Sequence, residues 1–276
     1  MFIRVKGKEM PPFKFIQVDI QRKIATIILN NTKKANSLNQ VMWDEIRIVF
    51  LELQKNKDVR VCILKSNGKH FSSGIDINYL KAIMEKTKSQ TPDHQTEFLY
   101  QTILKMQHAF SAITDCDKPV IAAIHGVCIG AGVDLITACD IRYSLYTSHF
   151  SIMETKLGIV ADMGTLQRLP NIISDGALKE LALTSKIFSA FKAKKIGLLN
   201  DCFLTRKRLY KKSYELAKQI ASLPPHAVQG TKTTINYARD HTVAEGLEQI
   251  AQMNSVLLNS PTMNEELSKI DSILNR

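Results

Sequence analysis

Apolar residues form short, nearly unbroken runs along the first part of the chain. The stretches Phe13–Ile20 and Ile24–Leu29 are rich in β-branched and aromatic residues and are separated by a short polar turn, which predicts a hairpin. The runs Val61–Leu64, Val120–Ile124 and Ile141–Leu145 are typical of buried strands. The sequence therefore predicts several strands between Phe13 and Leu145.

Other apolar residues recur every three or four positions, which predicts amphipathic helices between these strands. Two series show this spacing: Met42, Ile46, Val49 and Leu53, and then Leu99, Ile103, Met106, Phe110 and Ile113. Strands that alternate with helices indicate an α/β fold with parallel pairing. From Arg206 the pattern changes to successive helices, broken at Pro224-Pro225 and Pro261. We therefore expect an α/β core over residues 1–205 and a helical C-terminal region over 206–276, packed on α/β cores or exchanged between them.

The composition of the 276 residues, 45% hydrophobic and 23% charged, is that of an ordinary globular protein. No stretch of about 18 or more residues is free of charge and polarity, so we expect no membrane span. A net charge of +11 suggests an anionic partner: nucleic acid, acidic lipid or a phosphorylated cofactor. The basic residues are scattered, however, with no block of five in a row, and we expect most of the lysines simply to solvate helices.

The five cysteines form no C-x-x-C pair, and their odd number argues against a complete disulfide framework. We expect reduced, mostly buried thiols, as in a cytosolic or organellar protein. No apolar stretch follows Met1–Met10, so we expect no secretory signal. The final Leu274-Asn275-Arg276 is not a peroxisomal targeting signal. These features favour a cytoplasmic location, with the mitochondrial or peroxisomal matrix as the alternative.

Two glycine-containing turns follow predicted strands. Gly126-x-x-x-Gly130-x-Gly132 lies between a strand and a helix, and Phe71-Ser-Ser-Gly-Ile-Asp76 has a similar place after an earlier strand. Each turn offers a backbone amide, so the two together suggest an oxyanion hole with two donors. Close backbone packing explains such glycines equally well. Neither a dinucleotide fingerprint nor a phosphate-binding loop occurs, which disfavours nucleotide hydrolysis.

These turns also carry a specific resemblance. Phe71–Asp76, Lys118–Gly126, Gly130–Asp134 and Ala138–Arg142, followed by Gly164-Thr-Leu-Gln-Arg-Leu-Pro170, resemble in sequence and order the signature of the crotonase (enoyl-CoA hydratase/isomerase) superfamily. The resemblance implies a ClpP-like spiral of ββα units with a helical C-terminal region that serves oligomerisation, in a homotrimer or hexamer. It also implies a coenzyme A thioester substrate, with no separate cofactor.

By position, the oxyanion-hole amides of this superfamily correspond to those of Ile75 and Ala131. Many members carry Gly at the second position, but the amide survives the change to Ala. The resemblance further implies that Lys34 and Ala35, in a basic loop, and Gly74 and Asp76, in the first turn, bind the CoA part of the substrate.

Three carboxylates, Asp134, Glu154 and Asp162, follow the second turn at spacings of twenty and eight residues. Typical 2-enoyl-CoA hydratases carry Glu at the first two positions and Gly at the third. The present set is similar to that of Δ3,5-Δ2,4-dienoyl-CoA isomerases of fatty acid β-oxidation. That reaction moves a proton from C2 to C6 of the acyl chain, a distance that suits two acid/base groups better than one. The resemblance assigns C2 to Glu154; we assign C6 to Asp162 and an orienting role to Asp134.

Other interpretations remain open. A 2-enoyl-CoA hydratase would use Asp134 and Glu154 on a water molecule, although Asp162 would crowd that site. An RNA-binding protein on the same scaffold would account for the net charge, but the sequence lacks a dense basic arm with interleaved aromatic residues. We expect His125 to be a packing residue, and Asp140 and Arg142 to hold the strand after the active-site helix. The histidines and cysteines show no zinc-ligand spacing, so we expect no metal.

Overall fold

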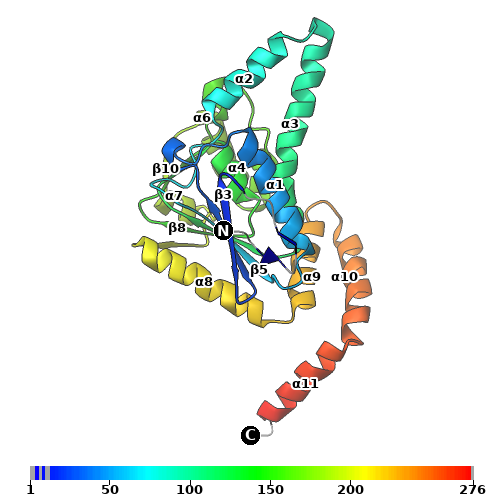
Figure 1. Cartoon of the computed structure of the whole chain (residues 1–276). Coiled ribbons are helices and arrows are strands. Elements are labelled where there is room, and N and C mark those ends of the chain that lie inside the picture. Colours follow the sequence, from blue (N-terminus) through cyan, green and yellow to red (C-terminus); the bar gives the residue numbers. More distant parts are fainter. Residues whose placement is uncertain (1–3, 6–7, 10–12, 275–276) are drawn as a thin grey trace.

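A computed structural model describes residues 4–5, 8–9 and 13–274 of the chain (Figure 1). The expectation about the C-terminal tripeptide lies outside these residues, apart from Leu274. Of the segment Met1–Met10, on which the expectation about targeting also depends, only residues 4–5 and 8–9 are described. Within the described residues, no helix is both long enough and apolar enough to cross a membrane.

The core is a six-stranded sheet in the order β11-β8-β6-β5-β4-β3. Neighbouring strands are parallel except for β3 and β4, which form the expected hairpin. The strands are β3 (Ile16–Gln21), β4 (Ile24–Leu29), β5 (Val61–Ser66), β6 (Val120–Ile124), β8 (Ile141–Leu145) and β11 (Asp201–Phe203). The predicted strands and their parallel pairing are confirmed, although the first strand begins three residues after Phe13.

Helices cover both faces of this sheet, which explains its unbroken apolar strands. Along β5, Cys62 and Leu64 pack in one hydrophobic cluster, and Val61 and Ile63 pack in another on the opposite face. The first cluster includes side chains of α1 (Gln40–Lys55), α3 (Pro92–Asp115) and α4 (Ala131–Thr137). The second includes side chains of α8 (Arg206–Ser222), the long yellow helix of Figure 1.

A second, three-stranded sheet in the order β10-β9-β7 lies beside the glycine-containing turns. Its strands are β7 (Val127–Ile129), β9 (His149–Ser151) and β10 (Phe188–Ser189). Strands of two or three residues are too short to show a periodic pattern, so the sequence does not predict this sheet. Strand β7 occupies the segment that appears in the sequence as part of a turn.

The remaining elements connect these layers or extend them. They are β1 (Arg4–Val5), β2 (Lys8–Glu9), η1 (Thr32–Lys34), α2 (Ile77–Lys88), η2 (Glu154–Leu157), α5 (Thr165–Arg168), η3 (Leu169–Asn171), α6 (Asp175–Thr184), α7 (Ala190–Lys195), α9 (Pro225–Tyr237), α10 (Val243–Leu258) and α11 (Pro261–Leu274). After Phe203 the described chain forms only helices, as expected, and α10 and α11 extend away from the core (Figure 1).

Candidate active site

Ser72 joins the two turns that the sequence singles out. Its amide donates to the carbonyl of Val127 at 3.1 Å, and its carbonyl accepts from the amide of Ile129 at 3.2 Å. Its buried hydroxyl donates to the carbonyl of Asn36 at 2.9 Å. A Cβ atom on Gly132 would lie 3.1 Å from the Ser72 carbonyl oxygen, so the start of α4 packs directly against this residue. The two turns, more than fifty residues apart in sequence, are thus held side by side.

The amides of Ile75 and Ala131 belong to these adjoining turns. Gly74, at φ +85°, precedes the first of them, and a Cβ atom there would lie 3.4 Å from the Ala131 nitrogen. Ala131 is the first residue of α4, where main-chain N–H groups have no partner within the helix. Within the described residues, neither amide has a hydrogen-bond acceptor. Two unpaired donors on adjoining turns are what an oxyanion hole requires; their role in binding a thioester stays a prediction.

Asp134, in the first turn of α4, is almost fully buried, at 1% exposure. One of its carboxylate oxygens accepts a 2.8 Å hydrogen bond from the amide of Thr165. Burial, together with the charges of Glu154 and Asp162, raises the pKa of Asp134 to about 7, against the lowering effect of the hydrogen bonding to Thr165. The structure thus brings the three predicted acids close enough to influence one another.

Glu154 begins η2 and presents its carboxylate beside the second turn. A Cβ atom on Gly130 would lie 3.4 Å from its Oε1 atom, while Oε2 is buried and has no hydrogen-bond partner within the described residues. Burial raises the pKa of Glu154, and the charge of Asp162 raises it too. Asp162 is half-buried in the irregular segment before α5, and burial raises its pKa as well. Carboxylates of this kind are suited to exchanging protons near neutral pH.

The buried Asp134 should make the stability of the fold depend on pH. Its pKa rises from 3.8 to about 7 on folding, so between these values the folded protein holds a proton that the unfolded chain has lost. The free energy of unfolding should therefore fall as pH rises through this window. Asp134→Asn keeps an acceptor for the Thr165 amide and removes the titration. One pKa unit corresponds to about 1.4 kcal/mol. The free energy of unfolding of the variant, relative to that of wild type, should therefore increase by about 2–4 kcal/mol between pH 4 and pH 8.

Urea unfolding of both proteins at several pH values measures this difference. A stability difference between Asp134→Asn and wild type that is the same at pH 4 and pH 8 would show that Asp134 ionises normally in the fold.

The residues predicted to hold the CoA part lie beside the first turn. Lys34 pairs with Asp76 at 2.8 Å, and the carbonyl of Ala35 accepts from the Ser73 amide at 3.0 Å. Asp76 also caps α2 by accepting from the amides of Asn78 and Tyr79. Although burial opposes it, these bonds and the Lys34 bond lower the pKa of Asp76. Asp76 therefore has a structural part in shaping the loop, and CoA contacts by these residues stay a prediction.

The hydrogen bonds of His125 within the described residues involve none of the three acids. Its ring is buried, with Nε2 at 3.1 Å from the Gly68 carbonyl and Nδ1 at 3.4 Å from the Tyr210 hydroxyl. Burial, with the nearby charge of Arg206, lowers its pKa to about 4, so it is neutral at physiological pH. These contacts agree with the expected packing role.

Asp140 and Arg142 have the expected structural contacts. Asp140 accepts from the Val120 amide at 2.7 Å and pairs with Lys232 at 2.8 Å. Arg142 donates to the carbonyls of Cys139 and Leu198 at 2.5 and 2.7 Å. Both residues therefore hold β8 in place. All five cysteines are free and buried, as expected.

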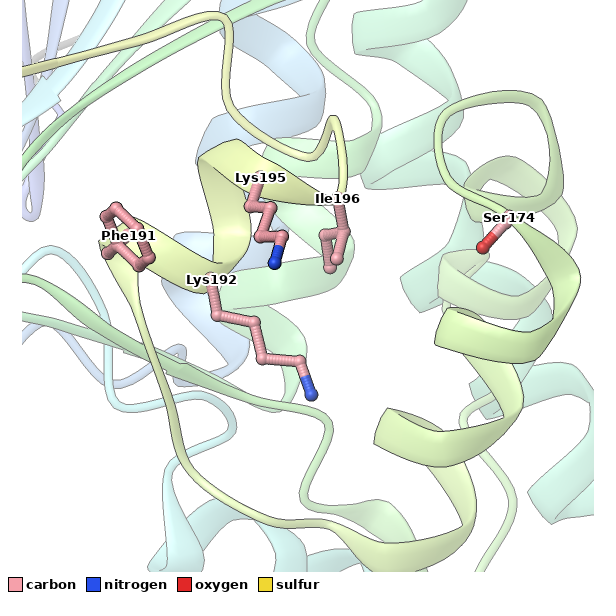
Figure 2. Close-up of a pocket in the computed structure, with 5 residues that line it drawn as sticks. All are labelled: Ser174, Phe191, Lys192, Lys195 and Ile196. Carbon is pink, nitrogen blue, oxygen red and sulfur yellow. The ribbon is translucent and has the colours of Figure 1, made fainter.

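A surface hollow lies between α7 and the start of α6. Figure 2 shows Lys192 and Lys195 on α7 pointing toward this space, with Ser174 on its other side. None of the predicted site residues lines it. Lys192 pairs with Glu180 at 2.9 Å, so part of its positive charge is already neutralised. Within the described residues, no group of three or more His, Cys, Asp or Glu side chains is arranged to hold a metal ion.

Some contacts of the site have no signal in the sequence. The amide of Thr165 donates to the carboxylate of Asp134, and Gln107 of α3 donates to the main-chain carbonyl of Asp162 at 2.6 Å. Thr165 and Gln107 are far in sequence from the residues they contact. Only the folded arrangement reveals these partners.

Comparisons with known proteins find relatives that match most of the chain. The sequence profile of the enoyl-CoA hydratase/isomerase family matches residues 19–269. The chain is 42% identical over 256 residues to the peroxisomal Δ(3,5)-Δ(2,4)-dienoyl-CoA isomerase of Arabidopsis thaliana, covering 92% of each chain. It is 38% identical over 242 residues to the mitochondrial enzyme of that name in Dictyostelium discoideum, covering 88% of this chain and 83% of the relative.

Solved structures show the same fold. A candidate enoyl-CoA hydratase from Thermobifida fusca YX, solved in complex with CoA, superposes with a TM-score of 0.79 at 26% identity, over 92% of this chain and 95% of that one. The expected crotonase fold, an α/β core with a helical C-terminal region, is confirmed.

Proposed function

The chain belongs to the enoyl-CoA hydratase/isomerase family, and from this premise we propose that it is a Δ3,5-Δ2,4-dienoyl-CoA isomerase. The observation that carries the proposal is the third carboxylate. Asp162 lies close enough to Glu154 to raise its pKa, within a cluster that also contains Asp134. The relatives from Arabidopsis thaliana and Dictyostelium discoideum support it, since both are dienoyl-CoA isomerases by name.

The reaction begins at C2 of a 3,5-dienoyl thioester. The unpaired Oε2 of Glu154 takes a C2 proton, and the electron pair of the broken C–H bond moves into an extended dienolate. The negative charge on the thioester oxygen is stabilised by the amides of Ile75 and Ala131. Protonated Asp162 then delivers a proton to C6, and the double bonds settle at C2 and C4. Asp134 orients the pair formed by the other two acids or biases it electrostatically.

The cycle closes when the proton on Glu154 returns to Asp162, directly or through solvent. No atom is added to the acyl chain, and no oxidant or separate cofactor is needed. A hydratase would instead add water across a 2,3 double bond using Asp134 and Glu154.

A spectroscopic assay with two substrates separates these activities. We expect the purified protein to convert 3,5-dienoyl-CoA into the conjugated 2,4-dienoyl-CoA. Hydration of a 2-enoyl-CoA of the same chain length should be slower by at least about 10²-fold, since Asp162 contributes only to the isomerisation. Faster hydration than isomerisation would assign the protein to the hydratases.

The C-terminal helices support the proposal that the enzyme is a homotrimer or hexamer. Within α10, no residue is buried in the single chain, and Val243, Leu247 and Leu258 are 80%, 64% and 61% exposed. These three positions lie on one face of the helix, and an apolar face of this kind calls for a covering partner. Light scattering should give three or six times the 31.1 kDa chain mass. Leu247→Glu combined with Leu258→Glu should lower the measured mass. A monomeric wild type would show that α10 does not serve oligomerisation.

We also propose an organellar matrix as the location, because the two named relatives are peroxisomal and mitochondrial. These names favour the alternative over the cytoplasm. Microscopy of the tagged protein beside peroxisomal and mitochondrial markers distinguishes the compartments. A diffuse cytoplasmic signal would count against the matrix.

A further inference from the structure

The proposed donor to C6, Asp162, lies in a segment without regular structure. In the described part of the chain, no main-chain N–H donates to the carbonyls of Asp162 or Met163. A catalytic side chain on such a segment needs support from elsewhere, because productive geometry tolerates displacements of only about 0.5 Å. Two side chains from different helices provide that support.

Gln107 of α3 holds the first of these carbonyls. Its Nε2 donates to the Asp162 carbonyl at 2.6 Å. The flanking residues Met106 and Phe110 are buried in the hydrophobic core, so this part of α3 is a firm base for the contact. The bond therefore fixes the main chain of Asp162 relative to the core.

Arg168 of α5 holds the second carbonyl. Its guanidinium donates to the Met163 carbonyl at 2.9 Å. It passes over Gly164, at φ +106°, where a Cβ atom would collide with the guanidinium. The two peptide groups that follow the Asp162 Cα atom are thus held by side chains of α3 and α5.

We propose that Gln107 is a positioning residue for C6 protonation, acting through the main chain of Asp162. This inference rests on the proposed isomerase function and goes beyond it by naming a residue outside the three acids. Gln107 contacts a carbonyl and not a carboxylate, so it sets where the Asp162 side chain lies. Glu154 belongs to a different element, η2, and is not held by this bond.

The test compares two activities of one variant in D₂O. Gln107→Met keeps an unbranched chain and removes the N–H donor. A displacement of about 1 Å costs on the order of 10²-fold, so we expect formation of 2,4-dienoyl-CoA to fall by about 10–100-fold. Deuterium exchange at C2 of the substrate should stay within about threefold of wild type, because Glu154 and the oxyanion hole are unchanged. KM should change little.

Gln101→Met is the matched control. Gln101 lies on the same helix and is exposed, and its amide donates to Glu97 one turn away. This control should match wild type in both activities. Gln107→Glu, which has the same size but offers no N–H when ionised, should repeat the separation of the two activities and keeps the test valid if Gln107→Met folds poorly.

Equal losses of exchange and product formation in both Gln107 variants, or no loss in either, would overturn the positioning role. A wild-type protein that does not isomerise 3,5-dienoyl-CoA would instead refute the proposed function, and this inference with it. An active wild type beside unaffected Gln107 variants refutes the inference alone.

Discussion

Glu154→Gln should abolish both isomerisation and C2 exchange, while Asp162→Asn should abolish isomerisation alone. Each substitution keeps the size of the side chain and removes its titratable proton. Without Glu154 no dienolate forms, so neither deuterium uptake nor product is expected. Without Asp162 the dienolate still forms between the Ile75 and Ala131 amides, but it returns to substrate by protonation at C2. General acid–base groups contribute about 10²–10⁴-fold, so each loss should be plain.

The measurement is mass spectrometry of the remaining substrate and the product after incubation in D₂O. In the Asp162→Asn protein, deuterium should accumulate at C2 of the substrate while little 2,4-dienoyl-CoA appears. The reverse pattern, with exchange surviving in Glu154→Gln and vanishing in Asp162→Asn, would exchange the two roles and leave the reaction class intact.

Ala131→Pro should lower kcat by about 10²–10³-fold, because it removes one of the two proposed donors to the thioester oxygen. Ala131 is the first residue of α4, the position at which a helix tolerates proline best, since the N–H lost there has no helical partner. Ile75→Pro removes the other donor and should have an effect of similar size. Both losses should appear in isomerisation and in C2 exchange alike, because both need the dienolate.

Gln40→Pro is the control for these proline substitutions. Gln40 is the exposed first residue of α1, and it is not one of the proposed site residues. Circular dichroism and thermal unfolding establish that each variant is folded. A folded Ala131→Pro protein with near-normal kcat would show that this amide does not stabilise the dienolate.

Much of the fold could be predicted because its strands are buried on both faces. Residues such as Val61, Ile63 and Ile121 then form unbroken apolar runs that are visible in a single sequence. The small sheet of β7, β9 and β10 could not be predicted, because two or three residues carry no period. Because this sheet could not be predicted, neither could the pairing of β7 with Ser72, which aligns the two turns.

The part of the candidate site that depends on the identity of side chains could be predicted from the sequence. The carboxylates at 134, 154 and 162 stand out by their spacing within a family pattern. The residues that hold these carboxylates in place do not stand out in the sequence. Gln107 is a polar residue beside the buried face of an amphipathic helix, and in sequence it is indistinguishable from a solvated glutamine. Its partner is a main-chain carbonyl 55 residues away, so only the folded chain shows the contact.

The proposed reaction moves a proton from C2 to C6 and adds no water. Mass spectrometry of the product that wild-type protein forms from 3,5-dienoyl-CoA in D₂O measures both features. We expect a 2,4-dienoyl-CoA with deuterium at C6 and no added oxygen. Unchanged 3,5-dienoyl-CoA, beside rapid conversion of a 2-enoyl-CoA to its 3-hydroxyacyl product by the same preparation, would contradict this expectation.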